Sequence, residues 1–205
     1  MTKLFTSTLI CFSIFAFSQK NETYIKANAL FLPVGMLNVG VEHGFTEHIT
    51  GQADIFVSPW KSFAGHQAQF GIGTVEGRYY FDEAFKHFYL GASIGVGVFN
   101  IQKWNYWKDD FYVTKEGEVL PYRMNQLYQK GFSYIFGLTT GYQFQLAERW
   151  NMDIFLGIGS QQGFYKGYVE GLPETQENRY DRVENWDKSG EIIPFKGGIM
   201  ISYKL

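Results

Sequence analysis

The clearest pattern in the chain is an alternation of apolar residues with small or polar residues between positions 132 and 146. One parity is mostly apolar and aromatic: Phe132, Tyr134, Phe136, Leu138, Thr140, Tyr142, Phe144 and Leu146. The other parity is mostly small or polar: Ser133, Ile135, Gly137, Thr139, Gly141, Gln143 and Gln145. Because side chains along a β-strand point alternately to its two faces, this segment predicts a strand with one apolar face.

The length of this strand and the character of its two faces point to a membrane barrel. It spans about 15 residues, whereas strands of globular proteins usually have about 5–6, and it is long enough to cross a bilayer at a tilt. Glycine, serine, threonine and glutamine cannot fill a dry barrel core, so we expect the apolar face to meet lipid. This arrangement is typical of outer-membrane β-barrels.

The same alternation recurs along the chain and predicts eight strands. Their expected ranges are 23–32, 36–45, 48–58, 71–82, 87–99, 132–146, 149–160 and 192–204. On the last of them, the apolar parity is expected to hold Phe195, Ile199, Ile201 and Tyr203. The predicted fold class is therefore all-β, an eight-stranded antiparallel up-and-down transmembrane β-barrel.

The predicted connections alternate in length. Short ones cover 44–48, 82–86 and 146–149, and long ones cover 59–70, 100–131 and 161–191. Only the short link at 33–35 departs from this order. Membrane barrels with both ends of the chain in the periplasm have short periplasmic turns and longer outer loops, so the order supports the barrel.

The N-terminus predicts export. Lys3 precedes an apolar segment that runs from Leu4 to Phe17, and Ala16 and Ser18 supply the small residues that a signal peptidase reads. We expect cleavage after Ser18, since the apolar run is too short for a transmembrane anchor. Residues 1–18 are therefore predicted to be a signal peptide, and residues 19–205 one barrel domain in the bacterial outer membrane. Cys11, the only cysteine, lies in the signal segment, so the mature chain would hold no disulfide or thiolate site.

Composition and charge agree with this prediction. The chain has 19% aromatic residues, 23 glycines and a formal net charge of −2. Glycine and aromatic residues suit strands that are crowded inside a barrel and carry aromatic girdles outside it. The charge gives no basic footprint for nucleic acid, so no nucleic-acid partner is expected.

Several segments resemble a known family. They are Lys26-Ala27-Asn28, Asn38-Val39-Gly40-Val41-Glu42, Glu76-Gly77-Arg78-Tyr79-Tyr80-Phe81, His87-Phe88-Tyr89-Leu90-Gly91, Gly141-Tyr142-Gln143 and Glu148-Arg149-Trp150-Asn151. Over nearly all of residues 24–205 the chain resembles the small outer-membrane barrels of unknown function that are common in Bacteroidota. It is more distantly similar to the transmembrane barrel of outer-membrane protein A.

The resemblance implies a route of assembly but no activity. Lys196, Gly198, Ile201 and Tyr203 have the spacing of a terminal assembly signal, displaced two residues from the end of the chain. Recognition by the barrel-assembly machinery is what this resemblance implies. The family brings no established activity to this chain.

The polar parity of the predicted strands collects ionisable residues. They are Lys26, Glu42, Asp54, Glu76, Arg78, Asp153 and Lys196. A lysine or arginine that faces lipid at mid-bilayer costs roughly 2–4 kcal/mol, so their parity supports an inward position. Because charges inside a narrow barrel must pair or be hydrated, we predict a polar network there. Its expected centre is Glu42, Glu76, Arg78 and Lys196. A polar pore or gate for small solutes is the alternative function of the same residues.

An enzyme is a second alternative, since some eight-stranded barrels modify lipid A with histidine, serine and an acid. The four histidines are His43, His48, His66 and His87, and only His66 is expected in an outer loop. No serine, histidine and acid converge by parity on one site, although a triad is defined by geometry. We predict no enzymatic activity, no catalytic residue, no metal ligand and no cofactor.

The long outer loops hold the remaining candidates. Loop 100–131 contains Trp104, Tyr106 and Trp107, which could form a recognition patch or continue the aromatic girdle. Asp109 and Asp110 could bridge lipopolysaccharide through divalent cations, although two adjacent acids are far from a calcium-loop pattern. We expect a monomer with a structural role in envelope integrity, with outer-membrane lipid and lipopolysaccharide as partners. Surface recognition would come through loops 100–131 and 161–191.

Overall fold

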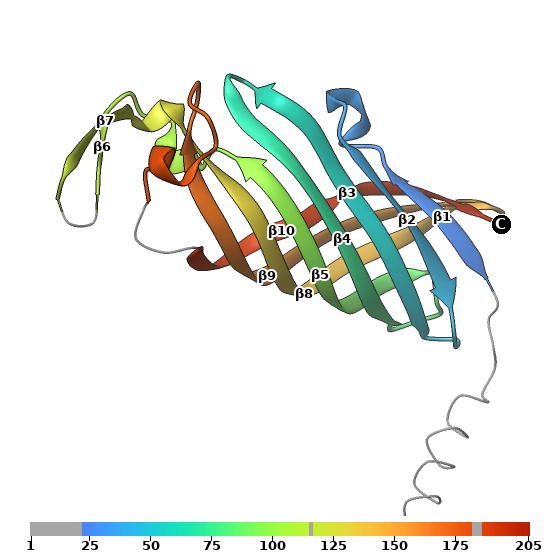
Figure 1. The fold of residues 1–205 in the computed structure, drawn as a ribbon. Helices are drawn as coiled ribbons and strands as arrows, with labels where there is room; N and C mark the ends of the chain where they lie inside the picture. Colours follow the sequence, from blue (N-terminus) through green and yellow to red (C-terminus); the bar gives the residue numbers. More distant parts are fainter. Residues whose placement is uncertain (1–21, 115–116, 182–185) are drawn as a thin grey trace, which may run out of the picture.

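Eight antiparallel strands form the barrel of the computed structural model, which describes residues 22–114, 117–181 and 186–205 (Figure 1). They are β1 (Thr23–Asn28), β2 (Leu37–Gly44), β3 (Ile49–Phe63), β4 (His66–Tyr80), β5 (His87–Ile101), β8 (Leu127–Ala147), β9 (Trp150–Val169) and β10 (Asp187–Lys204). Each strand pairs with its sequence neighbour among these eight, and β1 pairs with β10, so the sheet closes into a barrel. The prediction of an all-β chain with eight antiparallel strands is confirmed.

Smaller elements lie in the connections. A two-stranded sheet of β6 (Phe111–Val113) and β7 (Val119–Arg123) lies between β5 and β8. Short 3₁₀ helices occur at η2 (Leu32–Val34), η3 (Trp104–Tyr106), η4 (Met124–Gln126) and η5 (Gln176–Asn178). Within the described ranges, no helix has the length and apolar character needed to cross a membrane. The predicted signal segment 1–18 lies outside the described residues.

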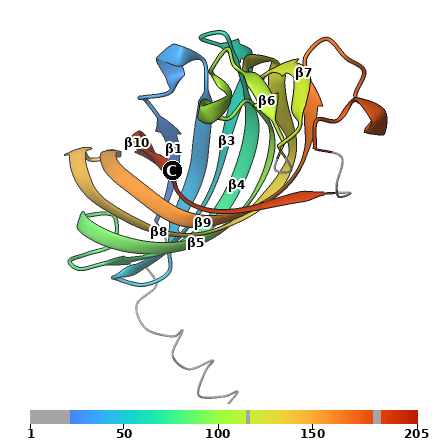
Figure 2. The ribbon, with the colours of Figure 1, turned by 90° about the vertical axis from the view of Figure 1, so that its left-hand side faces the viewer.

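The two ends of the barrel differ. At one end, here called the turn end, short turns connect β2 to β3, β4 to β5 and β8 to β9, and the C-terminus lies there too (Figure 1). At the other end, the loop end, lie the β6–β7 hairpin and the connection from β9 to β10 (Figures 1 and 2). β1 and β2 are the shortest strands of the barrel, with 6 and 8 residues. The part of β10 nearer the loop end therefore pairs with β9 alone.

Several predicted boundaries at the loop end are wrong. The segment 59–70 is not a loop, because β3 and β4 continue as a hairpin to a tight turn at Ala64 and Gly65. Both turn residues have positive φ, 52° and 86°, as a two-residue hairpin turn of type I′ requires. In the same way, β8 begins at Leu127, β9 extends to Val169 and β10 begins at Asp187.

The two faces of the wall are opposite in character to those of a protein with a dry apolar core. On the outward face, Val75, Ile94 and Leu138 are 60%, 61% and 71% exposed. The inward face carries most of the buried polar side chains, Glu42, Gln143 and Asp153 among them. Nonpolar surface thus lies outside and charge lies inside, as the alternation predicted.

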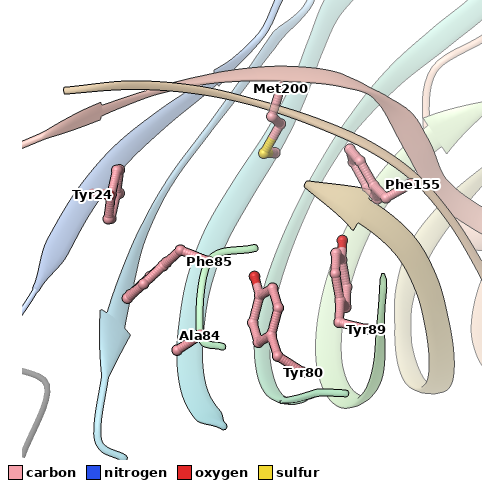
Figure 3. Packing of buried hydrophobic residues seen from close by; sticks show 7 residues of the cluster. All are labelled: Tyr24, Tyr80, Ala84, Phe85, Tyr89, Phe155 and Met200. Atoms are coloured by element: carbon pink, nitrogen blue, oxygen red, sulfur yellow. The ribbon is translucent and has the colours of Figure 1, made fainter. Parts of the chain in front are cut away.

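Aromatic residues close the interior at the turn end. They belong to a buried cluster of Tyr24, Tyr80, Ala84, Phe85, Tyr89, Phe155 and Met200 (Figure 3). Phe85 comes from the β4–β5 turn, which folds inward, and its ring centroid lies 4.6 Å from that of Tyr24. Phe85 has a φ of +68°, an unfavourable conformation for a phenylalanine. Two hydrogen bonds hold the turn: Ala84 N donates to Glu47 O at 2.6 Å, and Asn151 Nδ2 donates to Phe85 O at 3.3 Å.

Candidate functional site

The candidate site is a network of buried charges inside the barrel. The structure places all seven inward ionisable residues of the sequence analysis there: Lys26 on β1, Glu42 on β2, Asp54 on β3, Glu76 and Arg78 on β4, Asp153 on β9 and Lys196 on β10. None of them is more than 9% exposed. Residues far apart in the chain thus meet because the strands that carry them surround one interior.

At the centre of the network, two cations bridge two carboxylates. Lys26 Nζ lies 2.7 Å from Glu42 Oε2 and 2.7 Å from Asp153 Oδ2. Arg78 Nη1 lies 3.2 Å and 3.0 Å from the same two oxygens. Each charge therefore has two partners of opposite sign, which is the arrangement that allows ions to remain buried in a low dielectric.

A second group of contacts extends the network toward the loop end. Arg78 Nε donates to Glu76 Oε1 at 2.5 Å. Glu76 Oε2 also forms a salt bridge with Lys196 and accepts a hydrogen bond from Thr139 Oγ1 at 2.8 Å. Lys196 Nζ lies 3.7 Å from Asp54 Oδ1. Glu76 thus links Arg78 to Lys196, so the two groups form one continuous network.

Hydroxyl groups join this network to the aromatic cluster at the turn end. The Tyr80 hydroxyl lies 2.8 Å from Glu42 Oε1 and 2.7 Å from Gln143 Oε1. The Tyr89 hydroxyl donates to Asp153 at 3.0 Å, and the Arg78 guanidinium lies 4.4 Å from the centroid of the Tyr89 ring. In Figure 3 both hydroxyls point away from the turn, toward the middle of the barrel. The predicted network included neither tyrosine. Tyr80 has the same parity as Arg78 on β4, and Tyr89 has the same parity as the small inward residues of β5.

A β-bulge in β10 corrects one predicted orientation. Phe195 was expected on the apolar outer face, but it is only 5% exposed and lies inside, beside Lys196. The pairing with β9 shifts between Pro194 and Lys196, so the side chains of the consecutive residues Phe195 and Lys196 both turn inward. Glycines make room for the ring, since a Cβ at Gly137 would lie 2.3 Å from a Phe195 ring atom. A bulge interrupts the period of two, so parity alone could not have placed Phe195 correctly.

The outer-loop candidates do not form one patch. Trp104 is 81% exposed, and Trp107 stacks on His66 with ring centroids 4.2 Å apart. Tyr106 instead packs in the loop-end cluster, which contains Leu127, Val169 and Tyr180 with Tyr106, Tyr112, Leu120 and Tyr122 against them. Of the predicted surface residues, Trp104 is thus the most exposed aromatic side chain.

The two aspartates of the same loop differ in their contacts. Asp109 holds the loop together, since its carboxylate accepts hydrogen bonds from Arg123 at 2.6 Å and from Asn125 at 3.0 Å. Asp110 is exposed, and its backbone carbonyl accepts from Met124 N. Within the described residues, no group of three or more His, Cys, Asp or Glu side chains could hold a metal ion.

The four histidines lie at separate places in the barrel. Their hydrogen-bond partners are Thr23 for His43, the carbonyl of Tyr80 for His48, Gln102 for His66 and Asp82 for His87. None of these pairs brings a serine and a carboxylate to the same histidine, as a triad requires. The contacts that the structure gives to the buried network are ion pairs and hydrogen bonds across the interior.

Comparison with known protein families gives a match that covers almost the whole chain. The model of a family described as a protein of unknown function (DUF3575) matches residues 4–205. No curated protein and no solved structure matches the chain.

Proposed function

Because this chain belongs to the DUF3575 family of proteins of unknown function, we propose its function from its own structure: it is a closed outer-membrane β-barrel with a structural role in the cell envelope. Residues 1–18 would direct export and be removed, and residues 19–205 would form the barrel. The observation that carries the proposal is the combination of an apolar outer face with a charged interior. Such a wall is stable where its outer face meets hydrocarbon.

The dimensions of β8 support this proposal. Its outward residues from Phe132 to Phe144 are apolar or aromatic apart from Thr140. At about 3.3 Å per residue and a tilt of about 40°, this segment spans roughly 30 Å along the bilayer normal, the thickness of a hydrocarbon core. Aromatic residues lie at both ends of it, Phe132 and Tyr134 on one side and Tyr142 and Phe144 on the other, as in the girdles of membrane barrels.

The interior favours a structural role over a channel. The single side chain of Arg78 contacts carboxylates from three different strands. The side chains of the network therefore cross the lumen and connect strands on different sides of it. An eight-stranded barrel is only wide enough for side chains to fill its inside. A narrow channel or small-molecule transporter would need this network to open, and a lipid-modifying enzyme would need a reactive group that the four histidine pairs do not supply.

Partners follow from the same proposal. Outer-membrane lipid and lipopolysaccharide would surround a monomeric barrel, and the exposed Trp104 would be available for surface recognition. Lys196, Gly198, Ile201 and Tyr203 on β10 would be read by the barrel-assembly machinery during biogenesis.

The experiment that tests the proposal combines two measurements on the mature chain refolded in detergent. The first is migration on a gel in SDS with and without boiling, and the second is single-channel recording of the same sample in a planar bilayer. We expect a compact band that shifts on boiling and no conductance. A chain that stays soluble and folded without detergent would contradict the membrane location. Discrete current steps would replace the structural role with a pore, and Glu76, Arg78 and Lys196 would become the gate residues to mutate.

A further inference from the structure

On β4, β5 and β8, the outward face of the barrel changes character at one row of residues near the loop end. On β9 the polar character extends farther toward the turn end, since Gln162 and Ser160 are exposed on the outward face. Four neighbouring strands carry a polar residue at the same register position: Gln69 on β4, Asn100 on β5, Lys130 on β8 and Lys166 on β9. The row directly beneath it, two residues nearer the turn end, is apolar: Gly71, Val98, Phe132 and Phe164. If the apolar row lies in hydrocarbon, the polar row lies at the level of the headgroups.

Two lysines face each other in this polar row. Lys130 and Lys166 are directly opposite partners on β8 and β9, a position in which like charges destabilise a sheet. Lys130 Nζ lies 2.7 Å from Glu174 Oε2, with both side chains about half exposed. Lys166 Nζ lies 4.8 Å from the centroid of the Trp186 ring. An anion that bridges the two ammonium groups would relieve their repulsion, and the exposed Glu174 pair is too weak to prevent this.

An apolar groove leads away from the lysine pair along the outer wall. Gly71 and Gly73 form its floor, Ile55 and Val57 form one side, and Val96 and Val98 form the other. Its volume is about 430 Å³. A second hollow, which Lys130, Lys166, Phe132 and Trp186 help to line, shares Gly71 and Val98 with this groove. The lysines and the groove are therefore continuous on the surface.

We propose that this surface binds a phosphate-bearing anionic lipid, with its phosphate between Lys130 and Lys166 and an acyl chain in the groove over Gly71 and Gly73. The inference rests on the proposed function, since it needs the outer face to lie in a membrane. Lysine side chains at a bilayer surface attract anionic headgroups, and the aromatic rings of Phe132 and Trp186 lie beside them at the interface.

A second copy of the chain fits this surface less well than a lipid. A two-fold contact buries the same patch on both partners, so two lysine pairs would face each other at one depth in the membrane. Their like charges would oppose the contact, whereas a phosphate neutralises them.

The test measures lipid retention by the full mature protein in a neutral detergent, using native mass spectrometry. The probes are dioleoyl phosphatidylglycerol and dioleoyl phosphatidylcholine, which share their chains, and inorganic phosphate alone as a competitor. We expect the wild type to retain phosphatidylglycerol in preference to phosphatidylcholine. We expect the double substitution Lys130→Gln/Lys166→Gln to weaken that retention about 30-fold, the product of two lysine contacts at a membrane surface.

Matched controls separate the site from general charge and shape. Lys61→Gln/Lys108→Gln removes two exposed lysines of the same end of the barrel and should leave retention unchanged. Gly73→Leu fills the groove where the structure has open space, and Gly77→Leu places the same side chain in open space on the same strand outside the groove. We expect a loss of several-fold for both lipids at Gly73 and none at Gly77.

Each other outcome rejects the inference. Equal retention of the two lipids would mean that the surface does not recognise the anionic headgroup. Equal effects of the two lysine pairs would mean that the general charge of the loop end, and not this site, attracts the anionic lipid. Full competition by inorganic phosphate would mean an anion site without a lipid, and a change of oligomeric state in Gly73→Leu would assign the groove to a second copy. A wild type that gives the heat-modifiable band but shows no lipid preference rejects only this site, whereas a wild type that stays soluble and folded without detergent rejects the proposed function.

Discussion

Arg78 is the residue that holds the interior charges together. Its guanidinium is buried and contacts three carboxylates, those of Glu42, Glu76 and Asp153. Lys26 and Lys196 each share one or two of these partners, but neither reaches all three. The charge balance inside the barrel therefore depends more on Arg78 than on Lys26 or Lys196.

Removal of this guanidinium should destabilise the barrel strongly. Arg78→Ala takes one cation from three buried carboxylates, which then have only Lys26 or Lys196 as partners, so the interior holds more uncompensated negative charge. Removal of one partner from a buried ion pair typically costs about 3–5 kcal/mol. Arg123→Ala is the matched control, because its ion pair with Asp109 is exposed and worth about 0–1 kcal/mol. The free energy of unfolding in urea, followed by loss of the compact gel band, measures both. Similar losses for the two variants would mean that the buried network contributes no more than a surface pair.

Glycines on the inward face act through the space they leave. Gly137→Ala should lower the stability by about 1–3 kcal/mol, the usual range for overpacking, because the new Cβ would lie 2.3 Å from the ring of Phe195. Gly77→Ala, where the structure has open space, should change little. The midpoint of urea unfolding checks this, and Phe195→Leu in the Gly137→Ala background should restore part of the loss. If no such rescue occurs, the ring is not what limits the size of residue 137.

At the scale of the strands, the sequence predicts faces better than ends. The period of two identified Ile135 and Gln143 as inward residues, and both are buried, because a strand has no other way to arrange its side chains. The same rule fails at Phe195, where the bulge adds a residue to the ladder. It also fails at 59–70, since both faces of that extension of β3 and β4 carry polar residues. Backbone hydrogen bonds continue there without an apolar face to reveal the strand.

At the loop end, Arg179 forms salt bridges with Asp181 at 3.2 Å and with Asp187 at 3.5 Å, and this group of charges predicts a dependence on pH. Burial, and next to it the neighbouring Asp187 carboxylate, raise the pKa of Asp181 to about 7, although Arg179 opposes the shift. The other titratable groups around it are Tyr106, Tyr165 and Tyr180. Between about pH 4 and pH 7 the folded state holds a proton that the unfolded state has released, so stability of this loop falls as pH rises through that window.

The amide of Gly167 reports on this loop, because it donates to the Asp181 carboxylate at 3.0 Å. We expect its protection from hydrogen exchange, corrected for the intrinsic rate, to be about tenfold greater at pH 5 than at pH 8, a difference near one pKa unit after screening by solvent. Asp181→Asn should remove the difference. Equal protection of the wild type at both values would show that Asp181 is ionised throughout the range.

At the scale of the whole molecule, the distribution of polarity makes a prediction about the surroundings of the barrel. Val96 is 59% exposed on the outer wall, and Val119 is 63% exposed on the β6–β7 hairpin. In water the two positions would tolerate arginine equally well. If the wall lies in lipid, Val96→Arg should cost roughly 2–4 kcal/mol, while Val119→Arg should change little.

The yield of heat-modifiable barrel in the outer-membrane fraction measures this difference. We expect Val96→Arg to reduce it severalfold and Val119→Arg to match the wild type. Equal yields would contradict a lipid environment for the wall, since only hydrocarbon distinguishes two exposed valines in this way.

The buried network also has a consequence for biogenesis, because it draws on both ends of the chain. Lys26 comes from the first strand and Lys196 from the last, and Lys26 forms a salt bridge with Asp153 on β9, the strand before the last. A product that stops before β10 lacks Lys196, so Glu76 and Asp54 lose the cation they share. Such a product carries excess negative charge that it cannot bury. Truncated chains would therefore stay open to proteolysis, and the same ions that stabilise the finished barrel would distinguish it from unfinished ones.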